Sequence, residues 1–156
     1  MAKTIQFSLN GKRVSAELGE NRKLLWALRS DLGCTSPKYA CGEGFCGSCT
    51  VLVDNEPVRS CQYAMEDAAG KNITTVEGLS ANGLNPVQKA FAEHNAFQCG
   101  YCTPGMIVQA WHLLQKNPHP TREEIITAME ENLCRCGSYK RVVDAVEALS
   151  RRTSHE

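Results

Sequence analysis

The spacing of apolar residues changes near the middle of the chain. Before residue 77 they alternate with polar residues in short runs, which is typical of strands with one buried face. After residue 86 they recur every three or four positions, which is typical of amphipathic helices. We therefore expect an α+β protein with a strand-rich first half and an all-helical second half.

Local signals define the elements of the first half. Turn sequences at Asn10-Gly11 and Asp54-Asn55 predict two strand pairs. Leucines at helical spacing, followed by Gly33, predict one helix. The expected elements are a hairpin over 5–14, a helix over 24–32, and strands over 50–53, 58–61 and 73–76.

Four helices are expected in the second half. Their starting signals are Asn85-Pro86, Thr103-Pro104, a capping box that begins at Thr121, and Gly137-Ser138. A stretch with the composition of a linker precedes them. The predicted segments are a first domain over 1–77, a linker over 78–85, a four-helix domain over 86–150 and a tail over 151–156.

Charge and composition exclude several partners. Seventeen basic residues balance seventeen acidic ones, so no basic surface is expected to attract nucleic acid or an anionic membrane. No apolar run approaches the roughly 20 residues that span a bilayer, so direct membrane insertion is not expected. The first residues lack the apolar core of a signal peptide. We expect a cytoplasmic protein, with export of an assembled complex on a partner's signal as the alternative.

Cysteine is the unusual component of this chain. A set of disulfides is one interpretation of the nine cysteines, but nothing in the sequence indicates secretion, and nine is an odd number. In a reducing compartment, clustered cysteines more often bind metal, and their spacing indicates which metal.

The first cysteine set lies mostly in one glycine-rich stretch. Cys41, Cys46 and Cys49 have the spacing C-x4-C-x2-C of plant-type ferredoxins, and Cys61 follows from a later strand. The glycines allow the loop to turn tightly and to direct backbone amides at sulfur. A zinc ribbon has two close cysteine pairs instead. We therefore interpret this set as the four ligands of a [2Fe–2S] cluster.

The second cysteine set consists of two close pairs, Cys99 with Cys102 and Cys134 with Cys136. Each pair lies just before an expected helix, whose positive N-terminal end favours an anionic cluster. Spacing alone leaves structural zinc open for this set. The single residue between Cys134 and Cys136 is tight for a zinc site, and it suits two ligands that converge on a second small cluster.

Five segments in this order resemble the iron–sulfur subunit or domain of the molybdenum hydroxylases. This family includes xanthine dehydrogenase, aldehyde oxidoreductase, carbon monoxide dehydrogenase and isoquinoline oxidoreductase. The resemblance covers nearly the whole chain and implies that both cysteine sets hold [2Fe–2S] clusters. The segments are CGEGFCGSCTV at 41–51, SC at 60–61, QCGYCTPGM at 98–106, PTREEI at 120–125 and NLCRCGSY at 132–139.

The resemblance also implies a fold, a partner and a mechanism. The first domain would be a ferredoxin-like β-grasp domain and the second a four-helix bundle. A large partner subunit would bind molybdenum through a pterin dinucleotide and oxidise the substrate there. Electrons would pass through the helical-domain cluster and then the ferredoxin-like cluster to an FAD subunit or a cytochrome. Gln98 matches the residue that hydrogen-bonds the pterin, and Cys136 matches the ligand nearest to it.

The sequence departs from the family pattern without losing a ligand. The departures are Cys34, Ala40, Ser48 and Gly137-Ser138. The Gly137-Ser138-Tyr139 variant is similar to the isoquinoline oxidoreductase branch, in which the acceptor can be a cytochrome.

The remaining residues of note receive structural interpretations. Cys34 fits neither cysteine set and is expected to be a small buried side chain. Trp26, Trp111, Met106 and Met129 lie on apolar helical stripes and are expected in the core.

Two other functions remain open. A free-standing ferredoxin-like carrier would need neither a second domain nor Gln98. A zinc scaffold would lack the C-x4-C-x2-C loop and the visible absorbance of an iron–sulfur protein. Co-purification with a much larger, molybdenum-containing chain would separate the electron-transfer subunit from the free carrier.

Overall fold

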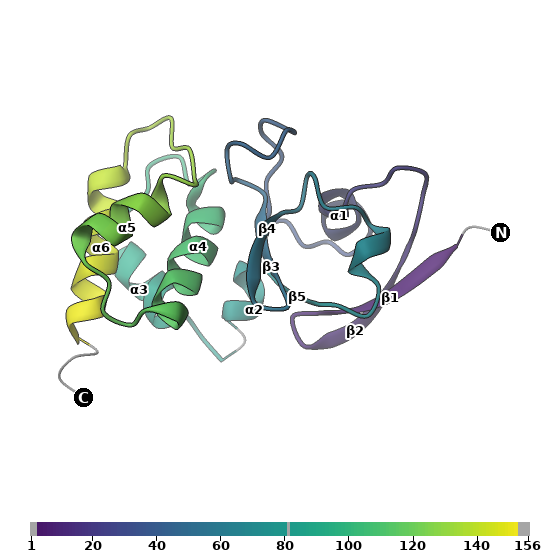
Figure 1. Cartoon of the computed structure of the whole chain (residues 1–156), viewed down its shortest axis with the longest axis horizontal. Coiled ribbons are helices and arrows are strands. Elements are labelled where there is room, and N and C mark those ends of the chain that lie inside the picture. Colours follow the sequence, from purple (N-terminus) through teal and green to yellow (C-terminus); the bar gives the residue numbers. More distant parts are fainter. Residues whose placement is uncertain (1–2, 81, 153–156) are drawn as a thin grey trace.

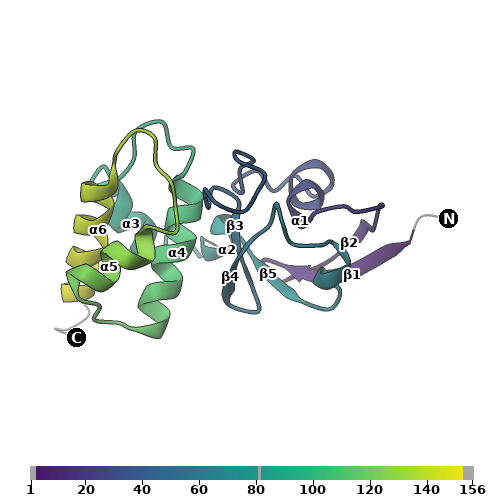
Figure 2. The same ribbon diagram turned by 45° about the horizontal axis from the view of Figure 1, so that its top comes forward.

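The computed structural model of the chain describes residues 3–80 and 82–152. A five-stranded sheet with a short helix occupies one end of the molecule, and a group of helices occupies the other (Figure 1). The two groups also lie side by side after a turn of 45° (Figure 2). The expected α+β class is therefore confirmed.

The sheet is mixed and has the strand order β2-β1-β5-β3-β4. β1 and β5 are parallel, and the other neighbours are antiparallel. Both predicted hairpin turns are present, with positive φ at Asn10-Gly11 and at Asp54-Asn55. The strands are β1 (Thr4–Leu9), β2 (Lys12–Glu17), β3 (Thr50–Val53), β4 (Glu56–Arg59) and β5 (Asn72–Thr74).

Two strands differ in position from the prediction. A two-residue turn pairs the residues on either side of it, so β4 begins directly after its turn. It therefore starts and ends two residues earlier than the predicted strand over 58–61. β5 ends before Thr75, because the amide of Thr75 donates a hydrogen bond to the side chain of Asn10. The short helix α2 (Val76–Leu79) follows and overlaps the start of the expected linker.

The helix predicted over 24–32 is present in a modified form. It starts as α1 (Leu24–Trp26) and continues as a wider π-type turn, η1 (Ala27–Asp31). The prediction that Trp26 lies in the core is wrong: its side chain is 42% exposed, and its ring lies 5.1 Å from that of Tyr39. The core-facing side of the helix is taken by its neighbours Leu24, Leu25, Ala27 and Leu28.

Four longer helices form the second half, as predicted. α3 packs against α4 and α6, and α5 packs against the same two helices. They enclose an apolar cluster that contains Met106 and Met129, while Trp111 packs against it in a partly buried position. The helices are α3 (Pro86–Glu93), α4 (Thr103–Lys116), α5 (Arg122–Met129) and α6 (Tyr139–Arg152).

Two of the predicted helix starts are confirmed in detail. The side chains of Asn85 and Thr121 each accept a backbone amide in a capping box that begins α3 and α5. Thr103 differs, because Cys102 holds the N-cap position and Thr103 is already the first residue of α4. At the other end, α6 extends into the expected tail, whose residues 153–156 lie outside the described part of the chain.

β3 connects the two groups of elements. All four of its side chains are buried. Val51 and Val53 belong to the apolar cluster of the sheet, which also contains Leu24 and Leu28 of the first helix. The alternate side chains of β3 point to the opposite face, where α4 packs. None of the helices in the described ranges is long and apolar enough to cross a membrane.

Candidate iron–sulfur sites

The first cysteine set is assembled from the loop before β3 and the residue pair after β4. Cys46, Cys49 and Cys61 are buried, while Cys41 is partly exposed. Cys49 and Cys61 pack together against Leu25 in a small apolar cluster. The pairing of β3 with β4 therefore brings the loop that contains Cys41, Cys46 and Cys49 next to Cys61.

The glycine-rich loop directs amides at sulfur, as its sequence predicts. Gly42, Gly44 and Gly47 have φ values of 73°, 83° and 72°, which an L side chain rarely adopts. The loop consequently folds back so that the amides of Glu43 and Cys46 both donate to Sγ of Cys41 at 3.4 Å. Slight burial of Cys41 raises its pKa, but these donors outweigh it and lower the pKa to about 7. The loop thus favours a thiolate.

Cys49 has the opposite environment. Burial raises the pKa of its thiol to about 11, against a backbone hydrogen bond from Cys61 that lowers it. The free thiol therefore keeps its proton at neutral pH. Binding iron at this position has to displace that proton, as metal binding to thiols generally does.

The second cysteine set lines a single hollow of about 160 Å³. Cys102 is the N-cap residue of α4, Cys99 precedes it, and Cys134 and Cys136 come from the segment between α5 and α6. Cys46 of the first set lines the same hollow. The two predicted sets are therefore neighbours, and the second is a single site although its pairs are far apart in sequence.

Ser138 supports Cys134 inside this hollow. Their side chains are 3.1 Å apart, and the amide of Cys134 donates to the hydroxyl of Tyr139 at 2.7 Å. Burial opposes ionisation of Cys134, but hydrogen bonds from the side chain and backbone of Ser138 lower its pKa to about 7. Burial, with Cys134 close by, raises the pKa of Cys102 to about 12. The second set, like the first, thus contains one thiol that ionises readily and one that does not.

Six of the eight candidate ligand thiols lie in pairs. Cys41 lies beside Cys46, Cys49 beside Cys61, and Cys102 beside Cys134. Over residues 3–80 and 82–152, no three His, Cys, Asp or Glu side chains converge as a site for one metal ion. Two thiolates on each of two irons is the requirement of a [2Fe–2S] cluster, whereas structural zinc needs three or four ligands around one point. The two sets of four cysteines, with the pairs Cys41–Cys46 and Cys49–Cys61 in the first, fit the ligand requirement of a [2Fe–2S] cluster.

Gln98 lies beside the second set. Its side chain is exposed, and its Nε2 donates to the backbone carbonyl of Cys136 at 2.9 Å. The two residues that the resemblance assigns to the pterin cofactor are therefore adjacent at the surface, although 38 positions separate them in sequence.

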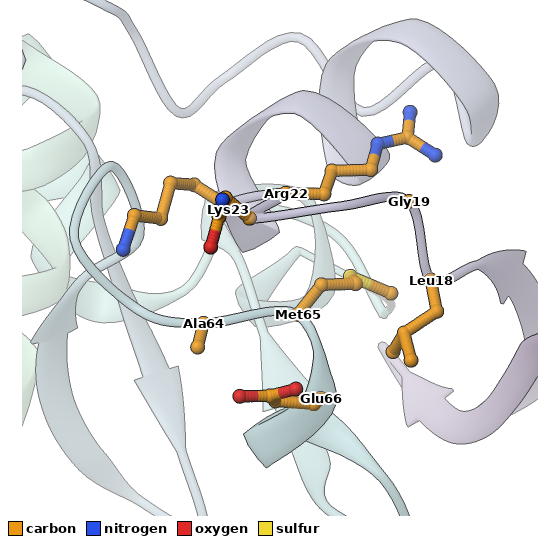
Figure 3. Close-up of a pocket in the computed structure, with 8 residues that line it drawn as sticks. Leu18, Gly19, Arg22, Lys23, Ala64, Met65 and Glu66 are labelled. Atoms are coloured by element: carbon orange, nitrogen blue, oxygen red, sulfur yellow. The ribbon is translucent and has the colours of Figure 1, made fainter.

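A hollow elsewhere on the sheet half contains no cysteine. It measures about 190 Å³ and lies between the loop before α1 and the segment 64–66 (Figure 3). Arg22 and Lys23 in its wall extend in different directions, Arg22 toward Asp31 and Lys23 toward the carbonyl of Gln62. Both basic side chains are thus engaged with their own half of the molecule.

Comparison with known proteins places the chain in a family. A family model described as a 2Fe-2S iron-sulfur cluster binding domain matches residues 7–75, and one described as a [2Fe-2S] binding domain matches residues 75–147. The small FeS subunit of nicotinate dehydrogenase from Eubacterium barkeri is 47% identical over 144 residues, which is 92% of each chain. The alpha subunit of isoquinoline 1-oxidoreductase from Brevundimonas diminuta is 40% identical, and the match covers 96% of this chain and 99% of that one.

A solved structure agrees over the same length. Quinoline 2-oxidoreductase from Pseudomonas putida 86 matches with a TM-score of 0.92 and 40% identity, covering 99% of this chain and 97% of that one. The chain belongs to the iron–sulfur subunits of the molybdenum hydroxylase family. Its role in such an oxidoreductase is electron transfer. Aldehyde oxidoreductase from Desulfovibrio desulfuricans has the same TM-score and identity, but the match covers 17% of its chain, so this iron–sulfur unit also occurs within longer proteins.

The structure adds residues to the iron–sulfur unit that sequence reasoning missed. Arg59, Asn132 and the amide of Leu133 all form hydrogen bonds between the loop of the first set and the segment that contains Cys134. No spacing rule identifies them, because their partners lie 72 to 87 positions away: Leu133 to Cys46 is 133 − 46 = 87. Only the adjacency of Asn132 and Leu133 to Cys134 is visible in the sequence.

Proposed function

We propose that this chain carries two [2Fe–2S] clusters and relays electrons from a molybdenum–pterin site on a large partner subunit to a final acceptor. The first cluster is held by Cys41, Cys46, Cys49 and Cys61, and the second by Cys99, Cys102, Cys134 and Cys136. The observation that carries this proposal is the pairing of thiols at two adjacent sites, together with amides directed at sulfur.

The number of clusters suits the chemistry of the family. Hydroxylation with oxygen from water removes two electrons from the substrate, and each [2Fe–2S] cluster accepts one electron. The chain's own residues contribute thiolates, hydrogen bonds that stabilise them, and burial that limits contact with water. The acceptor is an FAD subunit or a cytochrome, and the large molybdenum subunit is the partner on the other side.

Metal analysis and EPR spectroscopy of the reduced chain test this proposal. We expect about four iron atoms per chain and two distinguishable [2Fe–2S] signals, because the two sites have different surroundings. Cys46→Ala and Cys102→Ala should each remove a different signal. Stoichiometric zinc, or a single signal in the unaltered chain, would show that the proposal is wrong.

Gln98 and Cys136 are proposed to face the pterin cofactor of the partner. Their support is their contact with one another at the exposed edge of the second site. Gln98→Ala removes one hydrogen bond to the cofactor, worth about 0.5–1.5 kcal/mol net, and leaves every thiol in place. We expect unchanged iron content and an altered molybdenum EPR signal in the assembled complex. Gln115→Ala, at the opposite end of α4 from Cys102, is the control.

The finer architecture is proposed from the packing. The sheet with α1 forms a ferredoxin-like β-grasp domain over 1–77, and α3 to α6 form a four-helix bundle over 86–150. Each has its own apolar cluster, and the two family models meet at residue 75. We propose a cytoplasmic location, since reduced thiols are needed for cluster assembly. Limited proteolysis within residues 78–85 tests the domain boundary.

A further inference from the structure

Arg59 connects three parts of the molecule through one guanidinium group. It lies at the end of β4, and its side chain is only 17% exposed. Nε donates to the carbonyl of Gly44 at 3.2 Å, and Nη1 donates to Oγ1 of Thr50 at 2.7 Å. Nη2 donates to the backbone carbonyl of Glu131 at 2.6 Å and to its carboxylate at 3.0 Å. A residue of the sheet thus holds both the first cysteine loop and the segment before Cys134.

The same contact contains a direct backbone link between the two cysteine sets. The amide of Leu133 donates to the carbonyl of Cys46 at 2.8 Å. Cys46 belongs to the first set, and Leu133 is bonded directly to Cys134 of the second. Asn132, fully buried, adds a hydrogen bond to the carbonyl of Gly47 at 2.9 Å. One hydrogen bond and one residue, Leu133, therefore connect the backbone of Cys46 to that of Cys134.

The hydrogen bond from Arg59 to the backbone carbonyl of Glu131 holds this segment more firmly than the ion pair with the Glu131 carboxylate does. The carboxylate of Glu131 is 64% exposed, and exposed ion pairs contribute little. A hydrogen bond to a carbonyl from a charged, largely buried donor is stronger and fixes the backbone itself. The planar fork of arginine reaches Gly44, Thr50 and Glu131 at once, which the single ammonium of lysine does not.

We propose that Arg59 is a positioning residue for electron transfer between the two clusters. It holds the Glu131–Leu133 segment against the first cysteine loop, so that the hydrogen bond from Leu133 to Cys46 stays formed and the two sites keep a short, fixed separation. This inference rests on the proposed presence of two clusters. With both clusters bound, one electron would pass from the reduced second cluster to the oxidised first cluster, without transfer of a proton.

The test compares Arg59→Lys and Arg59→Ala with the unaltered chain in the assembled complex. Arg59→Lys keeps the positive charge, so it separates positioning from electrostatic effects on the reduction potentials. We expect both variants to keep both EPR signals and Arg59→Lys to keep both potentials. Freeze-quench EPR should show slower arrival of electrons at the first cluster in Arg59→Ala than in the unaltered chain, because the segment before Cys134 is no longer held against the first cysteine loop. Pulsed EPR should show a broader distribution of distances between the clusters.

Hydrogen exchange supplies a readout that does not depend on the clusters. The segment 131–134 should exchange faster in both variants, because Leu133 is released from Cys46. Arg22→Ala is the matched control: Arg22 is 21% exposed and also binds a carboxylate and a carbonyl, but both partners lie in its own half.

If both Arg59 variants match the unaltered chain in transfer rate and exchange, the inference is overturned; if Arg59→Ala does not fold, Arg59→Lys decides alone. A chain without two clusters would refute the proposed function instead, and exchange would still test the contact.

Discussion

At the scale of single residues, the surroundings of each sulfur separate Cys34 from the candidate ligands. Cys34 is buried in the apolar cluster of the sheet, and its Sγ lies 3.2 Å from Oγ1 of Thr75. Burial raises the pKa of this thiol to about 11, against the smaller effect of the Thr75 hydrogen bond. The prediction of a small buried side chain is confirmed. A backbone hydrogen bond from Ser36 opposes the effect of burial on this thiol but does not outweigh it, whereas two backbone amides donate to Cys41.

Replacing Cys34 should therefore leave the metal content unchanged. We expect Cys34→Ala to keep the full iron content and to cost about 1 kcal/mol of stability, since it removes one buried sulfur. Cys46→Ala, the control, should lose one cluster. Iron analysis decides, and loss of iron in the Cys34 variant would show that it is a ligand. In the folded chain at pH 8, Cys34 should also resist alkylation, because its thiolate is scarcely populated.

The hydrogen bonds of Glu77 predict that the stability of the fold depends on pH. Partial burial raises its pKa, but hydrogen bonds from Ser36 and Thr75 outweigh burial and hold the pKa below the ordinary value. A folded pKa below the unfolded pKa means that the stabilisation is complete above the ordinary range of a glutamate, near pH 4.3, and is lost as the pH falls through the folded pKa. Glu77→Gln should lower stability by about 1 kcal/mol at pH 7.

Urea unfolding of the two proteins between pH 7 and pH 4 measures this effect. The difference between their unfolding midpoints should be constant near neutrality and should shrink at the acid end. A difference that grows on acidification would show that the carboxylate of Glu77 is not stabilised by its partners.

At the scale of elements, the helix starts depend on caps that are local in sequence. Thr121 accepts the amide of Glu124, and the carboxylate of Glu124 accepts the amide of Thr121 at 2.7 Å. Thr121→Ala should cost about 1 kcal/mol. Thr127→Ala, an exposed position inside the same helix, should cost less than Thr121→Ala because no cap is lost. Thermal unfolding compares them, and equal midpoints would contradict the capping role.

The sequence predicts features that depend on neighbouring residues and misses those that depend on contacts between distant residues. The caps at Asn85 and Thr121, the two hairpin turns and the spacing of Cys41, Cys46 and Cys49 are defined by neighbours within a few positions, so local chemistry is sufficient to recognise them. The two pairs of the second set are each local, but their meeting in one hollow is visible only in the folded chain. The exposure of Trp26 is decided by which face of its helix meets the sheet, and Arg59 binds partners that lie far away in sequence. Such contacts exist only after folding, so no spacing within the chain reports them.

At the scale of the whole molecule, the two halves approach closely at Gly47. A Cβ on Gly47 would lie 2.6 Å from the carbonyl oxygen of Glu131 and would also meet the amide of Asn132. Gly70 offers a matched control, because its φ of 70° is nearly that of Gly47 at 72° but nothing lies within 4 Å of its added Cβ. Both substitutions incur the same backbone strain, about 1–2 kcal/mol.

Gly47→Ala should therefore lower the unfolding midpoint clearly more than Gly70→Ala does. It should also release the segment 131–134 to faster hydrogen exchange, whereas Gly70→Ala should not. Midpoints and exchange rates that agree between the two variants would mean that the close approach at Gly47 does not hold the halves together.

The hydrogen bonds from Asn132 and Leu133 to the loop of Gly47 and Cys46 also bear on how such a unit is inherited. A recombination that separated the halves near residue 75 would leave these carbonyls without their partners, at the place where the first loop must keep its shape. The exchangeable module is therefore the pair, although each half matches a family model of its own. Gene fusions that place the unit inside a longer oxidoreductase are expected to carry both halves, in this order and with this contact intact.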